Sequence, residues 1–125
     1  VYHGAYRLPL ASESIDVVLA SDVIQVMPPL DAVISEVRRV LAPGGQFVAT
    51  VPFRLFAETT VSKLDHLPLT DGLLPTVHGH EVHEFGWDIL DRLRAARFRR
   101  ALAYAYRSEE LGYYGIANMV FAADA

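Results

Sequence analysis

Short apolar runs and one amphipathic segment dominate the first half of the chain. Residues 14–21, SIDVVLAS, form a continuous run rich in β-branched side chains, which is typical of a strand covered on both faces. In residues 30–41, LDAVISEVRRVL, the apolar side chains recur at helical spacing and the polar ones occupy the other side. We expect the Pro-Gly-Gly at residues 43–45 to end this helix. Residues 46–51, QFVATV, then predict a second buried strand.

A strand, a helix and a second strand in this order predict a right-handed crossover with two parallel strands in one sheet. The carboxyl ends of both strands then open on the same edge of the sheet. In open α/β sheets this edge is where ligands bind. The pattern therefore indicates an α/β fold with a ligand site near residues 21–22 and 52–53.

The second half of the chain is less regular at first. Residues 54–86 combine prolines and glycines with weak periodicity, and we interpret them as a partly helical insertion or lid. Residues 87–98 predict an amphipathic helix with Asp88 in its first turn. Residues 100–107 and 115–124 predict two antiparallel strands joined by a short turn. We expect one domain, residues 1–125, divided into a core (1–53), the insertion (54–86) and a helix plus hairpin (87–125).

Charge and composition narrow the classes of partner. The net charge is -4 and the eleven Lys and Arg residues are mostly scattered, so no nucleic-acid partner is expected. No apolar run approaches the roughly 18 residues of a membrane span, and no membrane partner is expected. The chain has no cysteine, which excludes disulfides and thiolate metal sites. No secretory leader is recognisable at the start, so a cytoplasmic location is expected.

An ordered series of short motifs carries a family resemblance. Leu8-Pro9-Leu10, Ile15-Asp16-Val17-Val18 and the run from Arg39 to Gly45 follow one another as in the second half of the class I S-adenosylmethionine-dependent methyltransferases, which this chain resembles. The resemblance implies a Rossmann-like, three-layer α/β fold whose mostly parallel sheet has an antiparallel C-terminal strand. The chain has no Gly-x-Gly-x-Gly turn. We therefore expect the N-terminal half, which holds most of the cofactor in this family, to be missing.

The resemblance also implies which residues face S-adenosylmethionine. Two groups would border the cofactor, one before the first strand and one after it: Gly4, Ala5 and Tyr6, and Ser21, Asp22 and Val23. Gly4 stands where the family commonly has an aspartate that faces the adenine, and Gln25-Val26 stands where members often carry Glu-His. Tight cofactor binding by this chain alone is therefore not expected.

Residues 77–85, VHGHEVHEF, concentrate three histidines and two glutamates ahead of the second helix. A metal site would use His78, His80 and His83, but the spacing is not His-Glu-x-x-His and we expect no metal. The second interpretation is a catalytic base or substrate contact formed by His83 and Glu84. The third is a solvated loop with local hydrogen bonds.

We interpret the chain as a methyltransferase that acts on a small-molecule methyl acceptor, with His83 and Glu84 as the catalytic pair. The alternative is a non-catalytic module that forms a homodimer through the open edge of its first strand. A histidine-based metal module and a nicotinamide-dependent oxidoreductase are further alternatives. The oxidoreductase is disfavoured because its glycine fingerprint is also absent.

Overall fold

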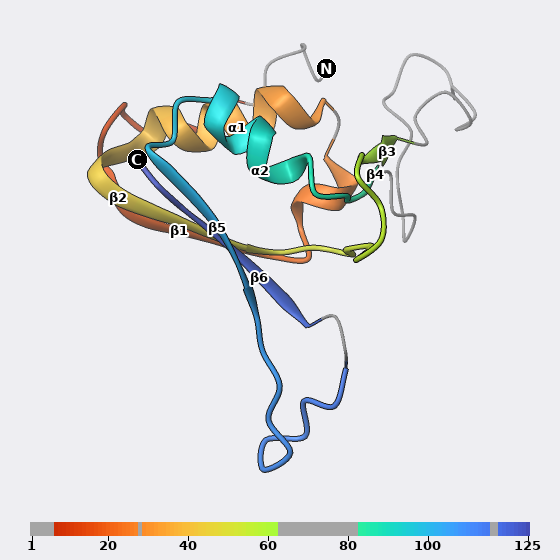
Figure 1. Cartoon of the computed structure of the whole chain (residues 1–125). Helices are drawn as coiled ribbons and strands as arrows, with labels where there is room; N and C mark the ends of the chain where they lie inside the picture. Colours follow the sequence, from red (N-terminus) through yellow and green to blue (C-terminus); the bar gives the residue numbers. More distant parts are fainter. Residues whose placement is uncertain (1–6, 28, 63–82, 116–117) are drawn as a thin grey trace.

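The computed structural model describes residues 7–27, 29–62, 83–115 and 118–125 (Figure 1). They form a four-stranded sheet in the order β1-β2-β6-β5 and a two-stranded sheet of β3 and β4. The elements in chain order are β1 (Ile15–Ser21), the short 3-10 helix η1 (Ile24–Val26), α1 (Leu30–Val40), β2 (Leu41–Thr50), β3 (Val61–Ser62), β4 (His83–Glu84), α2 (Ile89–Ala95), β5 (Arg100–Ala105) and β6 (Met119–Asp124).

The predicted crossover is confirmed. β1 and β2 pair in parallel, while β6 runs antiparallel to both β2 and β5. The two predicted helices are also present as α1 and α2, of 11 and 7 residues. Neither of them, nor any other helix in the described part of the chain, is long and apolar enough to cross a membrane. The result is the expected mixed α/β sheet with one reversed strand.

The end of α1 corrects one prediction. The helix ends at Val40, and Leu41 is already extended with φ −72° and ψ 129°, so Pro43-Gly44-Gly45 lies within β2 instead of ending the helix. Proline disfavours helical geometry in the residue before it, which turns the chain extended ahead of the glycines. The glycines instead form an irregularity in the strand: Ile15 pairs with Leu41 but Val17 pairs with Gln46.

Both helices lie on the same side of the four-stranded sheet, where they bury the core (Figure 1). The apolar stripe predicted for α1 is buried from Leu30 to Val40. It packs with Ile89 and Leu93 of α2 and with alternate strand residues such as Phe47 and Phe121. Each large side chain that is fully buried contributes about 1.5–3 kcal/mol relative to exposure. The packing of this single layer of helices on the sheet therefore contributes a large part of the apolar burial in the described chain.

The opposite face of the sheet is uncovered in the described part of the chain. Leu19 of β1 is 74% exposed and Val17 is 52% exposed. Leu19 pairs with Val48, Val48 with Ala122, and Ala122 with Leu102, so one apolar row crosses all four strands. The described residues thus supply two of the three layers that the family resemblance implies.

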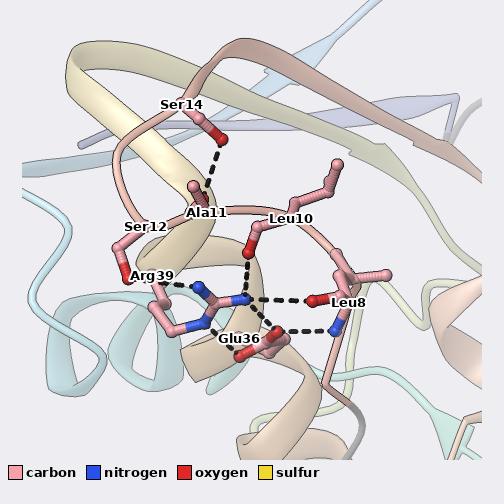
Figure 2. A network of polar contacts seen from close by, with 7 residues as sticks. All are labelled: Leu8, Leu10, Ala11, Ser12, Ser14, Glu36 and Arg39. Atoms are coloured by element: carbon pink, nitrogen blue, oxygen red, sulfur yellow. Dashed lines mark hydrogen bonds and ion pairs between the residues drawn. The ribbon is translucent and has the colours of Figure 1, made fainter.

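A polar network fixes the segment before β1 against α1 (Figure 2). Arg39 forms an ion pair with Glu36 at 2.6 Å between Nη2 and Oε1. The same guanidinium donates to the carbonyls of Leu8 and Leu10, and the Leu8 N–H donates to Glu36. The hydrogen bond from Arg39 lowers the pKa of Glu36 below its ordinary value. The Arg39–Glu36 pair, which is charged at neutral pH, therefore holds residues 8–10 in place ahead of β1.

Candidate functional site

The carboxyl ends of β1 and β2 lie side by side, as predicted. The Ser21 and Thr50 hydroxyl oxygens are 3.2 Å apart. The Asp22 N–H points at the same threonine, 3.1 Å from its carbonyl and 3.2 Å from its hydroxyl oxygen. The two strand ends are thereby tied together at the edge where a ligand is expected.

Asp22 and Val23 form an exposed turn at this edge. Asp22 has a left-handed backbone with φ 51°, which is uncommon for a residue other than glycine. Its carboxylate makes no hydrogen bond or ion pair with any described residue, and the Val23 side chain is 45% exposed. Strained backbone of this kind is concentrated at functional sites. Ser21, Asp22 and Val23 can therefore line one wall of a ligand site, whereas Gly4, Ala5 and Tyr6 lie outside the described residues.

The segment around β4 continues the same edge. Phe53, three residues beyond β2, forms a parallel bridge with Phe85. The Phe85 N–H donates to the Pro52 carbonyl at 3.1 Å, and the Arg54 N–H donates to the Phe85 carbonyl at 2.9 Å. β4 in turn packs against η1, the short helix that follows β1. Residues 83–85 are thus brought to the predicted ligand edge from a distant part of the sequence.

His83 is buried at this contact with only 3% of its surface exposed. Its ring lies close enough to the Met27 carbonyl for that oxygen to favour the protonated form, but neither ring nitrogen forms a hydrogen bond of good geometry. Burial lowers its pKa below the ordinary value of 6.5, with a smaller lowering from Arg92, and this outweighs the opposing effects of the Met27 carbonyl and Asp31. The imidazole is therefore neutral at pH 7. A neutral imidazole offers one N–H donor and one lone-pair acceptor.

Gln25 of η1 is the second buried polar residue of this contact, with 6% exposure and a side-chain carbonyl oxygen that has no partner. An unsatisfied buried polar group costs about 1–3 kcal/mol. The sequence pattern did not predict Gln25 as a buried polar residue, because the family resemblance marks its position only by the loss of an ionisable side chain. The signal was available, since a glutamine in the apolar run Val-Ile-Gln-Val-Met is an uncommon core residue.

Glu84 is placed differently from His83. Its Oε2 forms an ion pair with Nη1 of Arg54 at 2.9 Å, and its side chain is 24% exposed. Successive residues of a strand point to opposite faces, so β4 directs His83 into the buried contact and Glu84 toward Arg54. The structure therefore brings Glu84 together with Arg54, while His83 lies in the buried contact between β4 and η1. Of the other metal candidates, His78 and His80 lie outside the described residues.

An electrostatic network fastens α2 to this region. Burial would raise the pKa of Asp88, but hydrogen bonds from the Thr60 hydroxyl and from Arg92 outweigh it and hold the pKa below its usual range. Arg92 also bonds to Asp31 of α1 at 2.7 Å. Asp88 does not cap α2 through its side chain. Its carboxylate instead accepts the Thr60 N–H at 2.7 Å, which ties the start of β3 to the helix.

Comparison with known sequences gives two matches. Residues 2–49 match the family model described as "Methyltransferase domain". A malonyl-[acyl-carrier protein] O-methyltransferase of Methylococcus capsulatus is 42% identical over 64 residues, which are 51% of this chain and 22% of that protein. The family match contains β1, η1, α1 and most of β2, so it includes the strand ends that form one side of the candidate site.

Solved structures show the same fold. A S-adenosylmethionine-dependent methyltransferase from Mesorhizobium loti is similar with a TM-score of 0.60 and 15% identity, over 94% of this chain and 65% of that one. The 1,6-didemethyltoxoflavin-N1-methyltransferase of Burkholderia thailandensis, solved with S-adenosylhomocysteine, gives a TM-score of 0.53 and 16% identity over 91% and 45%. The chain thus spans less than two thirds of the length of each of these relatives.

Proposed function

We propose that the chain takes part in methyl transfer from S-adenosylmethionine to a small-molecule acceptor, because residues 2–49 match the methyltransferase domain family and the fold is shared with S-adenosylmethionine-dependent methyltransferases. The Methylococcus capsulatus relative is named as an O-methyltransferase, which favours oxygen as the atom that receives the methyl group. The observation that supports the proposal best is the buried, neutral His83 beside the carboxyl edge of the sheet.

The residues present fit one wall of a nucleoside site. The exposed Val23 offers apolar surface for a ring. The Ser21 hydroxyl and the Asp22 carboxylate, which has no partner among the described residues, offer polar contacts beside it. In the proposal these three residues hold the cofactor on the β1 side. The cofactor, when bound, supplies an electrophilic methyl group on a sulfonium.

His83 serves in the proposal as the base for the acceptor. A methyl acceptor that carries a proton must lose it as its oxygen becomes bonded to carbon, and a base is needed for that step. The unprotonated ring nitrogen of His83 accepts this proton, since burial keeps the imidazole neutral at pH 7. The packing of β4 on η1 also encloses the ring, of which only 3% is exposed.

Glu84 contributes to the same site through Arg54 in this proposal. The ion pair at 2.9 Å joins β4 to the segment after β2. Because the hydrogen bonds between Phe85 and residues 52–54 lie next to it, the pair supports the position of β4. Glu84 is therefore a positioning residue, and loss of its charge should alter the acceptor KM more than the cofactor affinity.

Calorimetric titration with S-adenosylmethionine tests the proposal. The titration is carried out on the 125-residue chain and on a form extended upstream. We expect binding by the extended form and a weaker affinity when Asp22 is changed to asparagine, while Asp91→Asn, an exposed change on α2, serves as the control. The absence of binding by the extended form contradicts the proposal.

A second candidate function has its own supporting observation. The exposed Val17 and Leu19 of β1 lie on the uncovered face of the sheet, and β1 is an edge strand. Apolar edge strands pair readily with other chains. We therefore also propose that the chain forms a homodimer through β1. Light scattering tests this: a mass that stays at the monomer value at high concentration contradicts it.

A further inference from the structure

Asp88 stands at the N-cap position of α2, but its side chain does not cap the helix. An aspartate at this position ordinarily accepts a hydrogen bond from the second or third N–H of its own helix. The Asp88 carboxylate instead accepts the N–H and the hydroxyl of Thr60 on one oxygen, and Nε of Arg92 on the other. Its side chain is only 22% exposed. The carboxylate therefore fastens the segment before β3 and leaves its own helix uncapped.

The Thr60 hydroxyl forms two hydrogen bonds at the end of the β3–β4 pair. It donates to Asp88 and accepts the Gly86 N–H at 3.2 Å. Thr60 directly precedes β3, and Gly86 lies two residues after β4. Two-stranded sheets are marginally stable by themselves, and each of these strands has only two residues. The hydroxyl therefore joins the two strands just beyond the point where their pairing ends.

Arg92 fixes the Asp88 carboxylate to both helices. It forms ion pairs with Asp88 at 2.9 Å and with Asp31 of α1 at 2.7 Å. The ion pair between Arg54 and Glu84 has an arginine side chain that is 64% exposed, compared with 32% for Arg92. Exposed ion pairs contribute little because water screens them. The Asp88 network is thus more sheltered than the other ion pair that supports β4 in the described part of the chain.

The β3–β4 pair carries His83 to its buried position. His83 pairs with Ser62 of β3, and β4 packs on η1 with only 3% of His83 exposed. We infer that Asp88 is a positioning residue of the candidate site: through the Thr60 hydroxyl it holds β4 against η1 and so keeps His83 enclosed. The inference rests on the proposed function for the role of His83 as the base. The sequence pattern places Asp88 only in the first turn of a helix and gives Thr60 no role.

The pKa of His83 reports how closely its ring is enclosed. Burial holds this pKa below 6.5, and water that reaches the ring of the folded protein raises it. For the measurement the histidine rings are labelled with carbon-13, and the His83 signal is the one missing from His83→Gln. Because this signal belongs to folded molecules, a loss of overall stability alone leaves its titration unchanged. The measured pKa therefore separates a positioning role from a merely structural one.

Thr60→Val keeps the shape of the side chain and removes both hydroxyl hydrogen bonds without changing any charge. We expect it to raise the pKa of His83 toward 6.5 by about half a pH unit or more, within the spread of about one unit that histidines show in folded proteins. Thr60→Ser keeps the hydroxyl and should retain the wild-type value. Thr59→Val makes the same change at an exposed neighbour and should also retain it. An unchanged pKa in Thr60→Val, or an equal rise in Thr59→Val, overturns the inference.

Asp88→Ala tests the same contact from the other end, and it removes no capping bond from α2 because Asp88 forms none. Loss of this negative charge leaves Arg92 less compensated, which lowers the pKa of His83, whereas loosening of β4 raises it. Asp31, the other charged group that acts on the ring, is present in every variant. We therefore expect a rise despite the lost charge, and no change in Asp91→Ala, which removes an exposed carboxylate of the same helix. A fall or no change in Asp88→Ala overturns the inference.

The outcome is independent of methyl transfer. A His83 pKa that responds to Thr60→Val, in a protein whose extended form does not bind S-adenosylmethionine, supports the positioning role of Asp88 and contradicts the proposed function. Cofactor binding and methyl transfer that require His83, together with a pKa that does not respond to Thr60→Val, support the proposed function and contradict the positioning role. The two failures are therefore distinguishable.

Discussion

The burial of a neutral His83 predicts how stability changes with pH. The folded protein holds this pKa below the ordinary value of 6.5 because the ring is buried. When the pH falls below 6.5, the unfolded chain binds a proton that the folded chain does not bind. The unfolded state is thereby favoured, so the free energy of unfolding decreases as the pH falls from 6.5 toward the folded pKa.

The size of the effect follows from one proton. Its largest slope is about 1.4 kcal/mol per pH unit, between the folded and the unfolded pKa. Asp88 and Glu36 also have lowered pKa values, but their ordinary values of 3.8 and 4.5 put their contributions at more acidic pH. The interval from about pH 5.5 to 7 therefore isolates His83 among the groups of the described chain whose pKa is shifted.

Urea unfolding measures this slope directly. Trp87 is the only tryptophan of the chain and reports through its fluorescence, since its indole N–H donates to the Leu55 carbonyl at 2.8 Å. We expect the wild type to lose stability between about pH 7 and 5.5 more steeply than His83→Gln, with parallel curves from about pH 7.5 to 9. Parallel curves over the acidic interval as well would refute the description of His83 as a buried neutral group.

Three further predictions concern packing and association. Leu93→Ala, at a side chain that is 1% exposed, should lower the free energy of unfolding by about 2–5 kcal/mol. Leu111→Ala, at 71% exposure, should change it by less than about 0.5 kcal/mol. Similar losses for the two variants in urea unfolding would contradict the assigned core. Gly86→Ala should destabilise the protein more than Gly112→Ala. A Cβ at residue 86 would lie 2.6 Å from the Thr59 backbone, whereas a Cβ at residue 112 would have no atom within 4 Å and would bear only the strain of φ 76°. The reverse order of melting temperatures would argue against this packing of the segment after β4. Leu19→Lys should reduce self-association in light scattering and Leu111→Lys should not, so an unchanged mass for Leu19→Lys would exclude the β1 face as the contact.

The pattern of the sequence predicted the elements whose burial is regular. The apolar spacing in residues 30–41 predicted α1 to within one residue, because one stripe of that helix is buried and its other side faces solvent. β1 and β2 were predicted as parallel from their order along the chain, since a helix between two strands leaves one favoured connection.

The contacts between distant segments were not predictable in the same way. His83 and Glu84 are neighbours in the sequence, which suggested that they act together, but a two-residue strand directs them to different surroundings. Gln25 gains its importance only from the packing of β4 against η1. No periodicity encodes that contact, because it depends on the hydrogen bonds of Phe85 with Pro52 and Arg54.

The residue at which α1 ends was also not predictable from the local motif. Glycines after an apolar stripe usually mark the end of a helix, and this general tendency placed the stop at Pro43-Gly44-Gly45. In the structure β2 already begins at Leu41, and the glycines occupy an irregular part of the strand. A carbon at Cβ of Gly45 would lie 2.9 Å from the Ala42 carbonyl oxygen, so the close approach of the chain there also requires glycine.

The transfer of a tritium-labelled methyl group from S-adenosylmethionine to small hydroxyl compounds tests the central claim most directly. For the form extended upstream, we predict label in the small-molecule fraction and a loss of about 10²–10⁴-fold in rate for His83→Gln, the range for removal of a general base. S-adenosylmethionine binding should remain in that variant. Transfer at the wild-type rate by His83→Gln, or no transfer to any acceptor by a form that binds the cofactor, would contradict it.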